Sequence, residues 1–320
     1  MDRRRQTRRL LTGAALAAAS FACVTIAADS PVRAARWLPL DRQAHALSRE
    51  PTECLAPAGD ARNSHLVAIG RAAFRTPLLL GGQAARAGLA CNSCHRNGRG
   101  NPDLQFPGLS GAPGTADVTS SLMSSHRGDG IFNPVAIPDL SGPASTLKIS
   151  RDPASPALRS FIHGLIVEEF DGPEPTARTL DGLAAYVRSL TPGACPATAE
   201  QHLGVATYLA DARADGQAAQ FALDANDPAT ARLMLASARS ALGLIDERYA
   251  SPALSRDRES LRAADLELAA IQQTLDTGQT DAPLRIAAWL ARLPRWSEPL
   301  RHDEPASLFD PAHLAASVAP

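Results

Sequence analysis

The segment Ala90-Cys91-Asn92-Ser93-Cys94-His95 determines how the rest of this chain can fold. Its Cys-x-x-Cys-His pattern is the attachment sequence of a c-type haem. Two thiols separated by two residues can both reach the vinyl groups on one edge of the porphyrin, and the histidine that follows can turn under the ring as the proximal iron ligand. The sequence contains one copy of the pattern. We therefore expect one covalent haem c, bound by Cys91, Cys94 and His95.

Two other interpretations of the cysteine pair are weaker. A thioredoxin-like Cys-x-x-Cys normally begins a helix directly after a strand, and no βαβ pattern precedes Cys91. A zinc site requires a second pair of cysteines or histidines at suitable spacing, and no such pair stands out. The sequence therefore favours haem attachment.

The N-terminus has the features of an export signal. Five arginines precede an apolar run over residues 10–26, and two small residues, Ala27 and Ala28, come before Asp29. This is typical of a secretory signal peptide, here residues 1–28, and the run is short for a membrane span. We expect a periplasmic protein with no membrane span in the mature chain; an uncleaved anchor is the alternative.

Composition limits the fold and the partners. The chain has 320 residues and a net charge of -1 at pH 7, so overall electrostatics give no reason to expect nucleic acid as a partner. Aromatic residues make up only 4% and alanine is abundant, which favours helices over sheets. The sequence predicts an all-α fold and does not specify an oligomeric state.

Two cysteines outside the motif form a candidate disulfide. Cys54 and Cys195 flank the haem segment, whereas Cys23 falls within the signal. In an oxidising compartment such a pair is expected to be bonded, which would contribute roughly 3–5 kcal/mol by restricting the unfolded chain. Two unpaired thiols are the alternative.

The first half of the mature chain predicts a haem domain over residues 64–196, preceded by an extended arm over residues 29–63. A helix is expected at 64–74, followed by a glycine- and proline-rich stretch through about residue 156 and by helices at 157–169 and 177–190. A loop region of this length needs something to fold around, and a covalent haem provides that apolar surface.

The second half predicts a separate domain. Apolar residues at helical spacing indicate four helices, at 199–221, 228–249, 256–275 and 283–293. We expect an antiparallel helical bundle over residues 197–300 and a flexible tail over residues 301–320. The predicted architecture is thus a cytochrome c-like domain of helices and long loops, followed by this bundle.

Residues 69–190 resemble the superfamily of di-haem cytochrome c peroxidases, which includes the methylamine dehydrogenase maturation enzymes. The resemblance lies in four segments, IGRAAFRTPLLLGGQAARAGLACNSCH (69–95), SSHRGDGIFNPVAIPDLSG (124–142), FIHGLIVEEF (161–170) and LAAYVRSL (183–190). Members of that family use two haems in tandem domains. This chain has a single attachment site and a cysteine-free region where a second would fall, so the family's peroxidase activity does not carry over.

The second axial ligand decides between electron transfer and substrate chemistry, because a filled sixth position makes a low-spin carrier and an open one admits ligands. His126 occupies the position that resembles the family's distal histidine, and we expect it to be the ligand. His163 and Met123 are the alternatives, as is a position with no protein ligand.

These features predict an exported mono-haem cytochrome that exchanges electrons with a partner protein. A peroxidase-like or maturation-type haem enzyme or accessory subunit, with an open distal position, is the second hypothesis. A haem-based sensor or scaffold is the third. Arginines near the motif (Arg86, Arg96, Arg99 and Arg127) form a possible basic rim that would pair with haem propionates or with an acidic partner.

Overall fold

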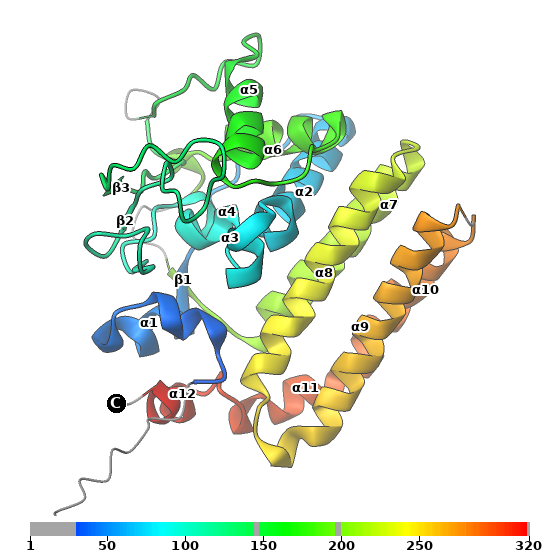
Figure 1. The fold of residues 1–320 in the computed structure, drawn as a ribbon. Helices are drawn as coiled ribbons and strands as arrows, with labels where there is room; N and C mark the ends of the chain where they lie inside the picture. The colour runs from blue at the N-terminus through cyan, green and yellow to red at the C-terminus, as the bar shows by residue number, and fades with distance from the viewer. Residues whose placement is uncertain (1–29, 144–146, 196–199, 279, 319–320) are drawn as a thin grey trace, which may run out of the picture.

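The computed structural model describes residues 30–143, 147–195, 200–278 and 280–318, so the predicted signal lies outside the described residues. The fold is mostly helical, which confirms the all-α expectation. Figure 1 shows the loop-rich half of the chain lying beside the long helices of the second half. Within the described ranges, no helix is both long and apolar enough to cross a membrane.

The N-terminal arm differs from the extended segment that we expected. It forms the 3-10 helices η1 (Arg33–Trp37) and η2 (Leu40–Arg42), the helix α1 (Gln43–Ser48) and the strand β1 (Arg49–Pro51). The Gln43 side chain closes this arm by donating to the Ala35 carbonyl at 2.9 Å. The ring centroid of Trp37 lies 4.2 Å from that of Phe106 in the loop region. The arm therefore has local structure of its own and also packs against the loop region.

The region of the motif contains short helices joined by loops. Its elements are α2 (Ala61–Arg75), η3 (Pro77–Leu79), α3 (Gly82–Ala87), α4 (Cys91–Cys94), η4 (Arg96–Gly98), α5 (Ala157–Gly164), the π-helical turn η6 (Leu165–Glu169), α6 (Ala177–Ser189) and η7 (Pro192–Ala194). The loop stretch holds one small antiparallel pair, β2 (Thr115–Ala116) with β3 (Val135–Ala136). The helices expected here are present, with ends shifted by a few residues.

Helices α2 and α6 cross in direct backbone contact. A Cβ atom added at Gly70 would lie 1.9 Å from the carbonyl oxygen of Gly182, so both helices need glycine at this point. Each helix starts at a side-chain cap: Asp60 accepts from the Asn63 amide, and Thr176 accepts from the Thr179 amide. Helix α4 packs against α2 of this crossing.

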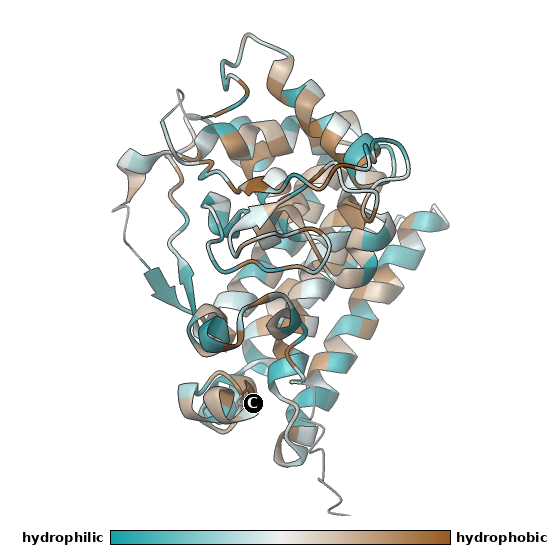
Figure 2. Cartoon of the chain, turned by 60° about the vertical axis from the view of Figure 1, so that its left-hand side comes forward, coloured by the Kyte–Doolittle hydropathy of each residue, from teal (hydrophilic) through white to brown (hydrophobic). Residues whose placement is uncertain are grey.

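Four long helices follow, as the sequence predicted: α7 (Val205–Asp224), α8 (Pro228–Arg248), α9 (Ser255–Asp276) and α10 (Ala282–Trp296), with the 3-10 turn η8 (Pro252–Leu254) before α9. The first of these begins later than expected, because residues 200–202 form β4 (Glu200–His202) and pair antiparallel with β1. Figure 2 shows this strand pair as hydrophilic throughout.

One large apolar core cluster runs through both halves of the described chain. One cluster of buried residues joins Ile69 of α2 and Leu183 of α6 to Leu209, Leu235 and Leu268 of the bundle helices. The bundle therefore shares its core with the motif region.

The C-terminal segment is folded, in contrast to the flexible tail that we expected. It forms α11 (Glu298–Asp303), η9 (Glu304–Ala306) and α12 (Pro311–Val318). Leu314 and Val318 are four residues apart, so they share one helix face, and they pack with Val32 and Leu47 of the arm. Figure 1 shows α12 beside α1, so the two ends of the described chain stabilise each other.

We expect Gly70→Ala to destabilise the fold by at least about 1–3 kcal/mol, because its methyl group would force α2 and α6 apart. Urea denaturation measures the change. Gly243→Ala is the matched control: it also lies in a helix, nothing lies within 4 Å of its added Cβ, and alanine should stabilise that helix by roughly 0.5–1 kcal/mol. Equal stability of the two variants would contradict the direct backbone contact of α2 with α6 at Gly70.

Candidate functional site

The motif forms a single helical turn whose backbone is held by neighbouring side chains. The Ser93 hydroxyl accepts from the Ala90 amide, and Asn101 donates its side-chain amide to the Ser93 carbonyl. Asn92 accepts the amide of Asn97 at 2.8 Å. The positions of the two thiols and of the following histidine are therefore fixed by hydrogen bonds that do not involve the thiols themselves.

His95 is held in one orientation and one protonation state. Its Nδ1 lies 3.0 Å from the carbonyl oxygen of Pro138. Because a carbonyl only accepts, Nδ1 must carry the proton, which leaves the lone pair on Nε2. Burial lowers the pKa of His95 to about 4, so the imidazole is neutral at pH 7. A neutral imidazole with its other nitrogen bonded to a backbone carbonyl is the usual state of a metal-ligating histidine.

Both motif thiols are held protonated. They retain part of their accessible area, yet burial raises the pKa of Cys91 to about 12, with help from Cys94, and burial also raises that of Cys94 to about 12. A disulfide oxidoreductase needs the opposite shift, toward the thiolate. In the described ranges no three His, Cys, Asp or Glu side chains come together to hold a metal ion.

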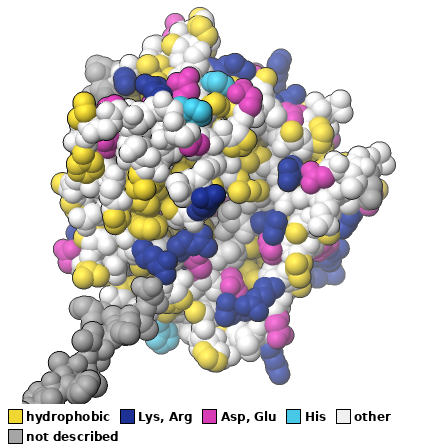
Figure 3. All heavy atoms as spheres, in the orientation of Figure 1, with side chains coloured by type: hydrophobic (Ala, Val, Ile, Leu, Met, Phe, Trp, Pro, Cys, Tyr) yellow, Lys and Arg dark blue, Asp and Glu magenta, His cyan; other side chains and the backbone are white. Residues whose placement is uncertain are grey.

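Apolar side chains surround the motif on two sides. Cys91 packs against the core cluster of α2 and α6 and also against a second cluster from the loop region. The buried members of this second cluster are Leu80, Ala84, Leu89, Phe106, Leu109, Ala116, Met123 and Phe170. Figure 3 shows hydrophobic side chains gathered on the face where the loop region and α3 lie.

The hydroxyl of Thr76, at the end of α2, is fully buried, and no described residue bonds to it. The ring of Phe74 lies 6.4 Å from the imidazole of His95. Two thiols, a neutral imidazole and apolar walls together fit a covalently attached haem.

The three candidates for the second axial ligand occupy different environments. Met123 is 1% exposed and belongs to the second cluster, which Cys91 also contacts. His126 has 63% of its side chain exposed and its Nε2 is 3.8 Å from Asp171. His163 is partly exposed and its Nε2 is 2.9 Å from Glu174. The structure thus brings Met123 toward the motif, whereas both histidines face carboxylates at the surface.

The loop that carries Met123 is tied to the turn η6. The Ser124 hydroxyl donates to the Glu168 carbonyl and accepts the amide of Arg127. Arg127 pairs with Glu169 at 2.9 Å. Three of the four arginines in the expected basic rim have partners in the chain, since Arg99 pairs with Asp139 and Arg96 donates to a backbone carbonyl. Two of the four arginines, Arg99 and Arg127, are thus paired with carboxylates, whereas the carbonyl that Arg96 contacts leaves its charge uncompensated.

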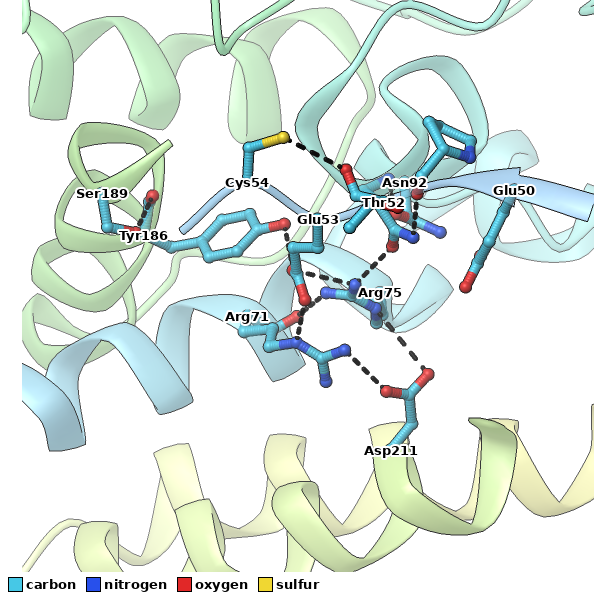
Figure 4. A network of polar contacts seen from close by, with 12 residues as sticks. Glu50, Thr52, Glu53, Cys54, Arg71, Arg75, Asn92, Tyr186, Ser189 and Asp211 are labelled. Carbon is cyan, nitrogen blue, oxygen red and sulfur yellow. Dashed lines mark hydrogen bonds and ion pairs between the residues drawn. The ribbon is translucent and has the colours of Figure 1, made fainter. Parts of the chain in front are cut away.

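A buried ion network, which sequence reasoning missed, lies behind the motif (Figure 4). Glu53 accepts from Arg71 at 2.7 Å, from Arg75 at 2.9 Å and from the hydroxyl of Tyr186 at 2.7 Å. Burial would raise the pKa of Glu53, but the two guanidinium groups and the hydroxyl lower it to about 2. Asp211 projects from α7 and binds Arg71 at 2.7 Å. No local sequence pattern connects residues this far apart.

Arg75 links this network to the motif. It donates to the side-chain oxygen of Asn97 at 2.6 Å, and Asn97 in turn donates its amide to the Asn92 side chain. Asn97 has a φ of 51°, an unusual conformation that asparagine tolerates better than most residues. The backbone just after His95 is thus connected by side chains to α2 and to the bundle.

Cys54 and Cys195 form a disulfide, with their Cα atoms 5.3 Å apart. Next to the bond, Thr191 donates its amide to the Cys54 carbonyl, and Leu55 bridges to Leu190. The bond ties the segment that carries Glu53 to the end of α6.

Comparison with known proteins finds no matching family model, no matching curated protein and no matching solved structure.

We expect Glu53→Gln to destabilise the protein by about 3–5 kcal/mol at pH 7, because two buried guanidinium groups lose their carboxylate. The pKa of Glu53 is lower in the folded state, so its contribution is present above pH 4.5 and is lost as pH falls toward 2. Urea denaturation at several pH values should show the difference between variant and wild type shrinking in that range. Glu298→Gln, at an exposed position, is the control with no expected effect. A difference in unfolding free energy between Glu53→Gln and the wild type that stays constant down to pH 2 would contradict this role of Glu53.

Proposed function

We propose that this protein is an exported mono-haem c-type cytochrome that transfers electrons to or from a partner protein. The observation that carries the proposal is the state of His95: neutral, fixed through Nδ1 to Pro138, and close in sequence to two partly buried thiols. The attached haem would supply a one-electron centre. Cys91 and Cys94 would hold it covalently, and Nε2 of His95 would bind its iron.

The surrounding residues suit electron transfer. The two clusters at Cys91 provide apolar walls, and the hydrogen bonds to Ser93, Asn92 and His95 hold the motif in place. A rigid and largely apolar environment changes little when the charge of the centre changes, which favours electron transfer. The disulfide between Cys54 and Cys195 supports an oxidising compartment such as the periplasm.

We propose Met123 as the second axial ligand, in place of the His126 that we expected. Its thioether is neutral, buried and part of the cluster that contacts Cys91. His126 or His163 would each have to leave a carboxylate and move inward to serve. A methionine opposite a histidine also raises the reduction potential relative to two histidines.

One observation supports the second hypothesis, that of a haem enzyme. The Oε2 atom of Glu169 is buried without a hydrogen-bond partner among the described residues, and burial raises the pKa of this carboxyl. Glu169 directly precedes Phe170 of the Met123 cluster. A buried carboxyl beside the Met123 cluster is the kind of acidic group that the haem-enzyme hypothesis requires. The sensor or scaffold hypothesis has no comparable observation in its support.

The absorption spectrum, recorded with and without carbon monoxide, tests the proposal. We expect the wild-type holoprotein to be low-spin and unaffected by carbon monoxide. Met123→Ala should keep its haem, become high-spin and bind carbon monoxide, since the iron loses one ligand.

His126→Ala is the matched control, and its spectrum should equal that of the wild type because the side chain is at the surface. A high-spin wild-type protein that binds carbon monoxide would support the enzyme hypothesis instead. A spectral change in His126→Ala but not in Met123→Ala would reverse the ligand assignment.

A further inference from the structure

Asp215 is a buried carboxyl that neither the haem site nor the ion network uses. It lies on α7, one turn after Asp211, and is 2% exposed. The hydroxyl of Ser237 on α8 lowers the pKa of this carboxyl, which opposes the effect of its burial. Helix α10 places the apolar side chain of Leu290 against Gly216, the residue next to Asp215. The charged groups that influence the pKa of Asp215 are Asp211 on its own helix, and Arg71 and Arg75 on α2.

The charges of the network balance without Asp215. Glu53 and Asp211 are two carboxylates, and Arg71 and Arg75 are two guanidinium groups, all joined by ion pairs. An ionised Asp215 would add a negative charge with no cation of its own. Burial and the neighbouring Asp211 raise its pKa to about 7, so both protonation states are populated near neutral pH.

The same network reaches the haem segment. Asp211 lies 3.9 Å from Arg75, which donates to Asn97, and Asn97 bonds to Asn92 inside the motif. Figure 4 shows Asp211 pointing from α7 toward the two arginines. All of these groups lie in a protein interior, where charges interact over longer distances than in water.

We propose that Asp215 takes up a proton when the haem is reduced, so that the protein moves a proton together with its electron. This inference rests on the proposed function. The electron comes from the redox partner and makes the iron centre more negative by one charge. The proton comes from solvent and converts the carboxylate of Asp215 to the neutral acid, so the interior gains no net charge. Oxidation releases the proton again.

Redox titration of the full-length holoprotein between pH 5.5 and 9 tests this. We expect the midpoint potential to fall as pH rises through neutrality, by up to about 59 mV for each tenfold change in proton concentration. Asp215→Asn should remove this slope. Asp257→Asn is the matched control, a buried carboxyl on α9 outside the network, and it should keep the slope.

A second variant tests the same inference in case Asp215→Asn does not fold. Ser237→Ala removes a hydrogen bond that lowers the pKa of Asp215, so it should move the sloping region to higher pH. Uptake of a proton upon reduction, followed with an indicator dye in weakly buffered solution, should vanish in Asp215→Asn only. A low-spin wild type with a pH-independent potential, or a slope that survives in Asp215→Asn, overturns the inference and leaves the cytochrome assignment intact. Absence of haem would overturn the proposed function itself.

Discussion

The hydrogen bond from Nδ1 of His95 to the carbonyl of Pro138 is the constraint on which the site depends. It sets the tautomer, it holds the ring, and it fixes the loop at residues 137–140 to the motif. The ion pair of Arg99 with Asp139, at 2.6 Å, holds the same loop from the other side. A segment rich in glycine and proline would otherwise have little to keep it in one conformation, since its regular structure among the described residues is limited to one pair of two-residue strands.

A second constraint joins the motif to the rest of the molecule. The network of Glu53, Arg71, Arg75 and Asp211 joins the arm, α2 and α7, and Asn97 extends it to the turn after His95. The apolar core is continuous across the same helices. The helical bundle is thus part of the structural support of the motif.

Sequence patterns predicted the features that depend on local spacing. The Cys-x-x-Cys-His pattern, the helices with apolar faces and the pairing of the two remaining cysteines all rest on residues close in sequence or few in number. Patterns did not predict the burial of Met123, because its polar neighbours Ser124 and Ser125 are typical of a surface loop. Nor did they predict the packing of α12 on the arm or the ion pair of Arg71 with Asp211, since these contacts join segments more than 100 residues apart. Charge balance among distant side chains is visible only in three dimensions.

The intact mass of the mature chain, purified from the periplasm of a host that attaches haem to c-type cytochromes, tests the central claim most directly. We expect the mass of the chain without residues 1–28 plus one haem, retained after denaturation, and we expect Cys91→Ala with Cys94→Ala to lose it. A mature chain with the mass of the polypeptide alone, and with two thiols that react with an alkylating reagent after unfolding, would contradict the account.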